Sequence, residues 1–222
     1  MPAYIIRSAI FGIVALLAFT FIPAGTVNYW QGWLYVATWI IVGSAYTVYV
    51  AKHDPALLKR RTEAGVSHEK EHAQKIIIVF LYVAFVLLIT LPPLDFRFGW
   101  SRVPWYVSVL GDVLIAVSFY IFYLVSKVNT YAAANVRVEE GQTVISTGVY
   151  GIVRHPMYAG ALLLLAGTPI ALGSWWSLLL VPLFVPILYF RIANEENVLK
   201  RDLRGYEEYT HKVRYRLIPG VF

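Results

Sequence analysis

Two polar segments at the ends of an apolar stretch carry residue types that could bind a charged ligand. The first is Arg154-His155-Pro156-Met157-Tyr158. Proline suits the first turn of a helix, so the free N–H groups of Met157 and Tyr158 would point back toward the preceding loop. Such a helix start binds carboxylate or phosphate readily, and His155 could add a donor or a proton. The alternative is an ordinary helix start where Arg154 and Tyr158 anchor to lipid headgroups.

The second segment is Arg191-Ile-Ala-Asn-Glu195-Glu196. Arg191 and Glu195 are four residues apart and share one face of a helix, whereas Glu196 lies about 100° around it. The simple interpretation is a surface salt bridge with Arg191 extending to the membrane interface. However, arginine ahead of glutamate is the weaker order for such a pair. Two adjacent glutamates where a helix leaves a membrane also add little stability, so the pattern favours a functional role.

A third pattern, His68-Glu69-Lys70-Glu71-His72, matches the His-Glu-x-x-His motif of zinc proteases. On a helix both histidines could face one zinc ion, with Glu69 as the base. A third ligand is not evident nearby, although Glu139 or Glu140 could in principle approach. The stretch is also rich in charges, as solvated loops are. We therefore expect no metal and keep a zinc membrane protease as a minor alternative.

These segments belong to a membrane protein, because 59% of the residues are hydrophobic and only 14% are charged. Apolar runs that cross or nearly cross about 30 Å of hydrocarbon occur at residues 5–22, 33–50, 76–91 and 106–126. A longer run, 158–191, is interrupted at 173–176 and predicts a helical hairpin. The expected fold is an all-α integral membrane protein with five to six transmembrane helices. The absence of cysteine excludes disulfides, thiolate ligands and a cysteine nucleophile.

The basic residues predict the orientation in the membrane. Of the 19 Lys and Arg residues, all except Arg97 and Arg102 lie at the N-terminus, in the 51–75 and 127–158 loops, or in the tail from Arg191. By the positive-inside rule both termini and both polar segments face the cytoplasm, in a multi-pass protein. We expect a prokaryotic plasma membrane rather than the endoplasmic reticulum. Orientation and anionic lipid account for the net charge of +6, so no nucleic-acid partner is expected.

The chain is expected to form one domain, with four transmembrane helices in residues 1–126 and a cofactor-binding region in 127–222. Asp54-Pro55 should open a short interfacial helix that Gly65 closes. Leu57 and Leu58 would face the lipid, and Lys59, Arg60 and Arg61 would face water. The polar 127–153 stretch is long for a loop, which is typical of a functional or disordered segment.

Several blocks together resemble the isoprenylcysteine carboxyl methyltransferase family of membrane enzymes. The resemblance covers residues 135–219. Its motifs are Thr147-Gly148-Val149-Tyr150, Arg154-His155-Pro156-Met157-Tyr158-Ala159-Gly160, Arg191 with Glu195-Glu196, and Gly205-Tyr206-x-x-Tyr209 followed by Pro219. The order and spacing of the blocks make the similarity specific. The first hundred residues are similar only as generic membrane helices.

The resemblance implies methyl transfer from S-adenosylmethionine to a lipophilic acceptor, such as the carboxylate of an isoprenylcysteine-like substrate that enters from the bilayer. Arg191 would bind and orient this substrate. The cofactor contacts that it implies, carried over by position, are Gln142, Thr143, Val144, Ile145, Tyr150, His155, Pro156, Met157, Tyr158 and Glu195. The family has a glutamine where this chain has Asn135, which is the least certain of these positions. A thiol or amine acceptor would need a base, and His155 or Glu196 would be candidates.

Two further functions stay open. The tail Tyr206-x-x-Tyr209 through Pro219 is also similar to that of membrane sterol reductases, which use NADPH. Those reductases have Asn where this chain has Met157 and lack the Pro156 step, so Pro156 and Ala161 favour the methyltransferase branch. A non-catalytic membrane protein that has kept the fold is the last alternative.

Overall fold

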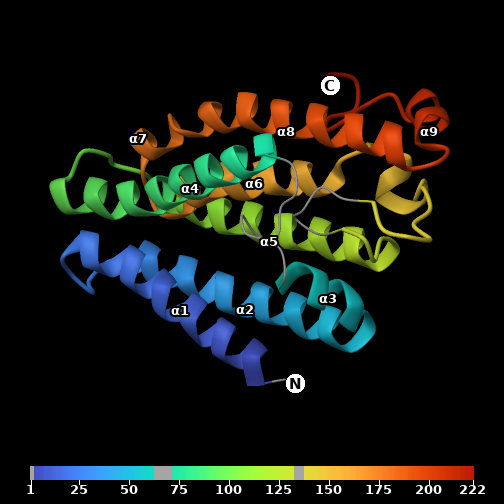
Figure 1. The fold of residues 1–222 in the computed structure, drawn as a ribbon. Coiled ribbons are helices and arrows are strands. Elements are labelled where there is room, and N and C mark those ends of the chain that lie inside the picture. Colours follow the sequence, from blue (N-terminus) through green and yellow to red (C-terminus); the bar gives the residue numbers. More distant parts are fainter. Residues whose placement is uncertain (1–2, 63–71, 133–137) are drawn as a thin grey trace.

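The computed structural model describes residues 3–62, 72–132 and 138–222, and in these ranges the protein is helical without strands (Figure 1). The helices in chain order are α1 (Ala3–Ala24), α2 (Trp30–His53), α3 (Pro55–Thr62), α4 (His72–Phe98), α5 (Trp105–Val128), the 3-10 turn η2 (Gly148–Gly151), α6 (Pro156–Ala171), α7 (Trp175–Leu178), α8 (Val181–Asp202) and α9 (Tyr206–Lys212).

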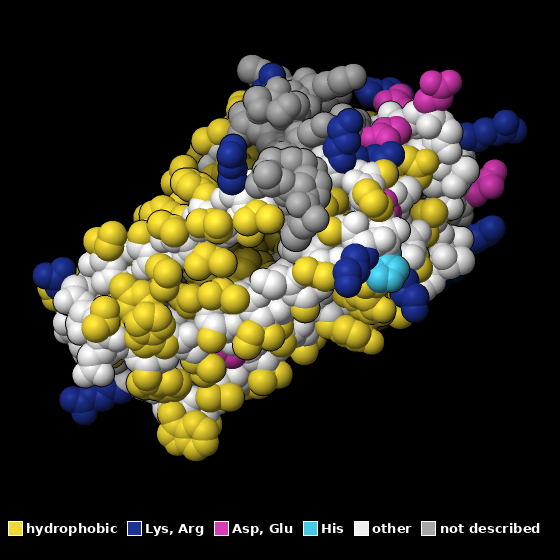
Figure 2. Space-filling view, turned by 90° about the horizontal axis from the view of Figure 1, so that it is seen from below, with side chains coloured by type: hydrophobic (Ala, Val, Ile, Leu, Met, Phe, Trp, Pro, Cys, Tyr) yellow, Lys and Arg dark blue, Asp and Glu magenta, His cyan; other side chains and the backbone are white. Residues whose placement is uncertain are grey.

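Five helical segments are long and apolar enough to cross a membrane, which confirms the expected all-α membrane fold. They are Ile6–Ala24, Trp30–His53, Lys75–Phe98, Trp105–Val128 and Trp175–Asp202. Figure 2 shows hydrophobic side chains over much of the face formed by α1 and α2, with charged side chains toward its ends. Such a surface would be unfavourable in water, so the protein is a multi-pass membrane protein.

Helices α6 and α8 form the expected hairpin. At 16 residues α6 is about 24 Å long, shorter than the five spans. Gly173 then takes a φ of 73°, and the Ser174 hydroxyl caps α7 by accepting a hydrogen bond from Ser177 N at 3.0 Å. Ser174 also donates to the buried Asp95 carboxylate near the end of α4. This contact fixes the hairpin turn against α4.

Helix α6 packs closely against α5 through glycines. A Cβ atom on Gly111 would lie 2.2 Å from the backbone N of Ala171, and one on Gly167 would lie 2.9 Å from Gly111 O. The Ser118 hydroxyl donates to Gly160 O at 2.7 Å. Small residues that allow backbones to approach this closely are a common basis of helix association in membranes. They hold the helix that begins at His155-Pro156 in a fixed position.

Gly111→Ala should therefore destabilise the protein. The added methyl would overlap backbone atoms, which cannot move as the end of a flexible side chain can; such overpacking costs about 1–3 kcal/mol. Gly12→Ala is a matched control, because its Cβ would meet nothing within 4 Å. Thermal unfolding in detergent should show a lower midpoint for Gly111→Ala than for Gly12→Ala. Equal midpoints would contradict this packing.

The C-terminal segment folds back onto the start of α6. Helix α8 ends at Asp202, Gly205 turns the chain with a φ of 85°, and the tail follows α9. Arg154 N donates to Tyr215 O and His155 N donates to Arg216 O, each at 2.9 Å. The tail after α9 therefore lies beside the residues that lead into α6.

The expected helix after Asp54 forms as α3, and the Asp54 carboxylate caps it by accepting a hydrogen bond from Leu57 N at 2.9 Å. Its side chains differ from the interfacial arrangement that the sequence suggested. Leu57 is fully buried against protein, among Val50, Val125 and Ala132, rather than facing lipid. The Arg60 guanidinium contacts Glu139, and the Arg61 guanidinium contacts Ala132. The expected end at Gly65 lies outside the described residues.

Candidate active site

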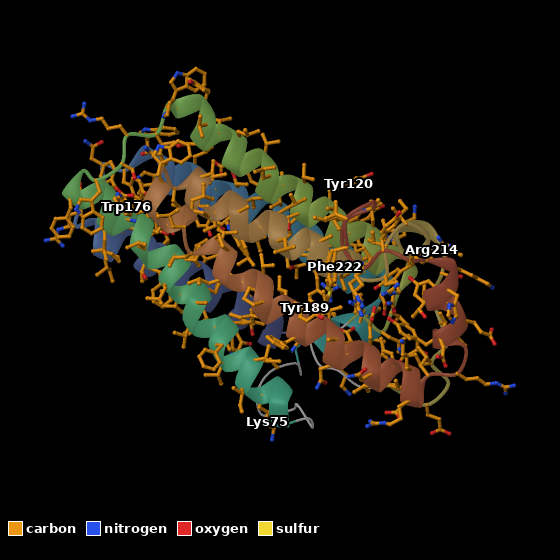
Figure 3. The ribbon with its side chains drawn as sticks, turned by 90° about the horizontal axis from the view of Figure 1, so that it is seen from above. Lys75, Tyr120, Trp176, Tyr189, Arg214 and Phe222 are labelled. Atoms are coloured by element: carbon orange, nitrogen blue, oxygen red, sulfur yellow. The ribbon has the colours of Figure 1, made fainter. Side chains whose placement is uncertain are left out.

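A narrow cleft of about 90 Å³ lies where the loop after α5, the start of α6, the end of α8 and helix α9 meet. Figure 3 shows Trp176 of the hairpin turn at one end of the bundle and Arg214 of the tail at the other, where the cleft lies. Of the residues that the resemblance implies, nine line it: Gln142, Thr143, Val144, Ile145, Tyr150, His155, Met157, Tyr158 and Glu195. Segments separated by more than fifty residues in sequence are thus brought together.

The predicted Arg191 and Glu195 pair is bridged by a third residue. The Tyr158 hydroxyl donates to Glu195 Oε2 at 2.6 Å and accepts from Arg191 Nε at 2.9 Å. The Arg191 guanidinium also lies over the Tyr158 ring, 5.9 Å from its centroid. Arg191 is only 4% exposed, and Glu195 lies on the cleft wall. The Tyr158 hydroxyl therefore links the buried arginine to the cleft.

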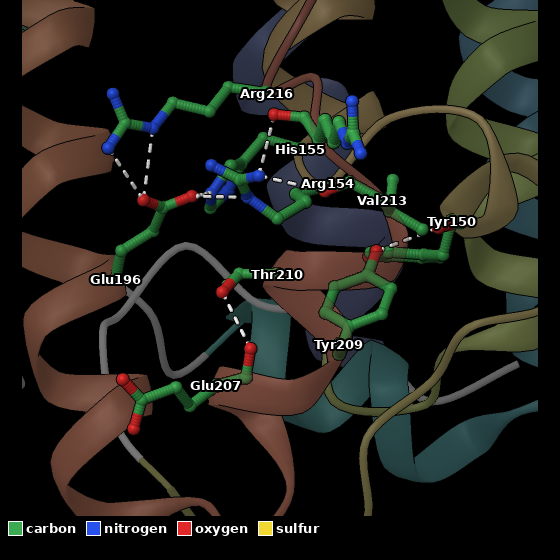
Figure 4. A network of polar contacts seen from close by, with 10 residues as sticks. Tyr150, Arg154, His155, Glu196, Glu207, Tyr209, Thr210, Val213 and Arg216 are labelled. Atoms are coloured by element: carbon green, nitrogen blue, oxygen red, sulfur yellow. Dashed lines mark hydrogen bonds and ion pairs between the residues drawn. The ribbon is translucent and has the colours of Figure 1, made fainter.

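Glu196 is the centre of a buried ionic network (Figure 4). Its Oε1 accepts from Arg154 Nε at 2.7 Å and contacts His155 Nε2 at 3.2 Å, while its Oε2 accepts from Arg216 Nε at 3.0 Å. Arg154 Nη1 continues the network by donating to Val213 O and Arg214 O, each at 2.8 Å. Both carboxylate oxygens are thus in contact with guanidinium or imidazole groups. A carboxylate held in this way is a poor proton acceptor.

Tyrosines form the wall of the cleft nearest α9. Tyr209 Oη donates to Tyr150 O at 2.7 Å, and Asn129 Nδ2 donates to Tyr150 Oη at 2.8 Å. Burial raises the pKa of Tyr150 to about 12 and that of Tyr206 well above its ordinary value. Both therefore present neutral hydroxyl groups at physiological pH.

The Tyr206 hydroxyl is a buried polar group beside the cleft. Tyr206 is 5% exposed and lines the cleft, yet its hydroxyl has no hydrogen-bond partner among the described residues. A buried polar group without a partner costs about 1–3 kcal/mol, so such groups are normally paired. A ligand in the cleft with an accepting or donating group would satisfy it.

The start of α6 offers fewer free donors than the sequence suggested. Pro156 takes the first helical position as expected, after His155. The N–H groups of Tyr158 and Ala159, however, both donate to His155 O, at 3.1 and 3.2 Å. The expectation of a free Tyr158 N–H is therefore wrong, because the chain before the helix turns tightly enough to close this bond.

Some predicted residues lie outside the described part of the chain. Asn135 is one, and His68 and Glu69 of the zinc motif are others. Glu139, considered above as a further zinc ligand, instead accepts hydrogen bonds from Arg60. Within the described ranges no group of three or more His, Cys, Asp or Glu side chains could hold a metal ion.

The sequence analysis missed several contributors to the site. Arg216 binds Glu196 from the tail, and Asn129, Tyr131 and Ala132 line the cleft directly after α5. Tyr206 and Tyr209 belong to the motifs of the resemblance but are not among the cofactor contacts that it implies, yet both line the cleft. The sequence indication for Arg216 was its place in a basic tail, because a buried glutamate such as Glu196 is stabilised by a nearby arginine.

Most of the region that forms the cleft is similar in sequence to a known protein family. Residues 106–204 match the sequence model of the phospholipid methyltransferase family. The chain is also 28% identical over 189 residues to the "Probable protein-S-isoprenylcysteine O-methyltransferase" of Oryza sativa, in both subspecies indica and japonica. The aligned residues cover 82% of this chain and 93% of those proteins.

A second similarity is more local. Over 85 residues, or 37% of the chain, it is 33% identical to the "Delta(14)-sterol reductase TM7SF2" of Mus musculus, where the match spans 20% of that protein. The methyltransferase match extends over 82% of this chain and 93% of the relative, and the family match includes Tyr158, Arg191 and Glu195. The chain is therefore a membrane methyltransferase, similar to the phospholipid methyltransferase family over residues 106–204 and to the named isoprenylcysteine O-methyltransferases over most of its length.

Proposed function

We propose that the protein transfers a methyl group from S-adenosylmethionine to the carboxylate of a lipophilic, isoprenylcysteine-like acceptor at the cytoplasmic face of a plasma membrane. The observation that carries this proposal is the cleft, which gathers nine of the residues implied by the methyltransferase resemblance. Relatedness to two methyltransferase families supports the same reaction. The orientation rests on the distribution of the basic residues.

The donor set of the cleft fits the cofactor. Glu195 would bind the ammonium group or the ribose hydroxyls of the cofactor, and the Tyr206 hydroxyl would form a hydrogen bond with one further polar group. Tyr150 offers an aromatic ring beside them. The bound cofactor supplies an electrophilic methyl group on a sulfonium ion, which the ring and Glu195 would also attract electrostatically.

A separate groove supports a lipophilic acceptor. It lies between α4 and α8, has a volume of about 680 Å³, and is lined mainly by apolar residues. Its lining residues are Ile76, Ile77, Phe80, Pro186, Ile187, Phe190, Ala193, Asn194 and Asn197. The Asn194 Oδ1 atom is buried there and has no hydrogen-bond partner in the described part of the chain. A hydrocarbon chain would fill the groove, and Asn194 would receive a polar group near its head.

Arg191 stands in the sequence between Phe190 and Asn194, which both line this groove. It also contacts Tyr158, which lines the cleft. It would bind the acceptor carboxylate and hold it in line with the methyl group. A carboxylate is already ionised at neutral pH and needs no general base. Catalysis would then consist of positioning two bound reactants and excluding water.

We assign Glu196 to positioning rather than to proton transfer. It fixes Arg154, His155 and Arg216, and thus joins the tail to the start of α6. Arg154 and His155 also line the cleft, so their orientation depends on this carboxylate.

Methyl-labelled S-adenosylmethionine and farnesylated N-acetylcysteine test the reaction with the purified protein in lipid vesicles. We expect a labelled product that releases methanol in mild base, as a carboxyl methyl ester does. Matched vesicles that contain phosphatidylethanolamine test the main alternative, an amine acceptor. Label that is found only in base-stable lipid product would overturn the carboxylate acceptor and retain methyl transfer.

A further inference from the structure

Helix α3 lies outside residues 106–204, which match the phospholipid methyltransferase family, yet its arginines contact residues that line the candidate active site. Its Arg60 binds the Glu139 carboxylate through two nitrogens: Nε donates at 3.0 and 2.9 Å and Nη2 at 2.7 Å. Arg60 Nη1 donates to Thr130 O at 3.3 Å, and its guanidinium lies 5.0 Å from the centre of the Tyr131 ring. One side chain thus contacts both described ends of the segment that runs from α5 into the cleft.

Arg61 makes a second set of contacts one residue further on. Its Nε donates to Ala132 O at 3.0 Å, and its Nη2 donates to Ser126 Oγ at 3.3 Å. Nη1 binds the Tyr46 hydroxyl, and Nη2 lies 3.8 Å from the Met157 sulfur. Burial lowers the pKa of Arg61, so placing this guanidinium here is costly and is offset by its contacts. Ala132 and Met157 both line the cleft.

Glu139, the partner of Arg60, is hydrogen-bonded in turn to Gln142, which the resemblance implies as a cofactor contact. Glu139 N donates to Gln142 Oε1 at 3.0 Å, and Gln142 N donates to Glu139 O at 3.1 Å. Gln142 begins the four-residue stretch that lines the cleft. A shift of Glu139 would therefore move Gln142 and the residues that follow it.

We infer that Arg60 and Arg61 are positioning residues that fasten the cofactor-binding loop to α3, so that the N-terminal half of the chain completes the active site. This inference rests on the proposed function for the identity of the ligand, but the fastening itself is a property of the free protein. The two adjacent arginines act in parallel, since Arg60 holds the side of the loop near Glu139 and Arg61 holds Ala132 and Met157. Bidentate arginine contacts fix orientation as well as distance.

Charge reversal tests the inference. In Arg60→Glu the glutamate would repel Glu139, and we expect faster hydrogen–deuterium exchange in residues 138–145 of the ligand-free protein. Affinity for S-adenosylhomocysteine, measured by calorimetry in detergent, should fall about tenfold or more. Arg60→Gln removes the ion pair without repulsion and should show the same effects more weakly. Lys52→Glu, on an exposed position at the end of α2, makes the same charge change away from the loop and is the control.

The two measurements separate this inference from the proposed function. If exchange in 138–145 and ligand affinity are the same in Arg60→Glu, Arg60→Gln and Lys52→Glu, the loop does not depend on α3 and the inference is wrong. Faster exchange with weaker binding supports it. Faster exchange in a protein whose wild type binds no S-adenosylhomocysteine supports the fastening and overturns the proposed cofactor.

Discussion

Replacing Glu196 by alanine is expected to destabilise the protein by about 3–5 kcal/mol, the usual cost of removing one partner from a buried ion pair. The carboxylate is only 3% exposed and lies among Arg154, His155 and Arg216. Without it, two guanidinium groups would remain close together with no compensating charge. The loss should appear as a marked fall in the thermal unfolding midpoint of the detergent-solubilised protein.

A matched control is Glu207→Ala, which removes an exposed glutamate from α9. Its unfolding midpoint should stay close to that of the wild type, as for most surface substitutions. Arg216→Ala should have an intermediate effect, because that side chain is 29% exposed. If Glu196→Ala unfolded at the same temperature as Glu207→Ala, the network would not be holding the tail against α6.

Replacing Arg191 by alanine is expected to reduce turnover by about a hundredfold or more while leaving cofactor affinity within a fewfold of the wild type. Misplacing a bound reactant by about 1 Å can cost this much in rate. Arg191 contacts the cleft through Tyr158, and Tyr158 should keep its hydrogen bond to Glu195 in the variant. Steady-state rates with the prenylated acceptor and calorimetry with S-adenosylhomocysteine measure the two effects separately.

Arg191→Lys is an informative comparison, because it retains the charge but cannot present two parallel donors to a carboxylate. We expect it to recover only part of the lost turnover. An equal loss of turnover and cofactor affinity in Arg191→Ala would contradict the assigned role, and would make Arg191 part of the cofactor site instead.

The fold was largely predictable because its main determinants are local in sequence. Runs of apolar residues predicted the membrane helices, and Gly173-Ser174 predicted the hairpin turn. The structure extends each of these four helices by one or more residues at both ends. The close α5–α6 contact at Gly111 was not predicted, because a single glycine in an apolar run carries no sign of which helix it faces.

The candidate site was predictable only in part. Spacing placed Arg191 and Glu195 on one helix face, but it could not show that Tyr158 from another helix would lie between them. The roles of Arg60 and Arg216 were missed for a related reason. Each meets its glutamate across a long or folded-back segment, and such pairings depend on tertiary structure rather than on local pattern.

The most direct test of the account is calorimetric titration of the detergent-purified protein with S-adenosylhomocysteine and, separately, with NADPH. We predict that S-adenosylhomocysteine binds, that His155→Ala abolishes this binding, and that Tyr206→Phe weakens it by up to about tenfold, the contribution of one hydrogen bond. Saturable binding of NADPH by folded protein that does not bind S-adenosylhomocysteine would contradict the account and favour the reductase-like function.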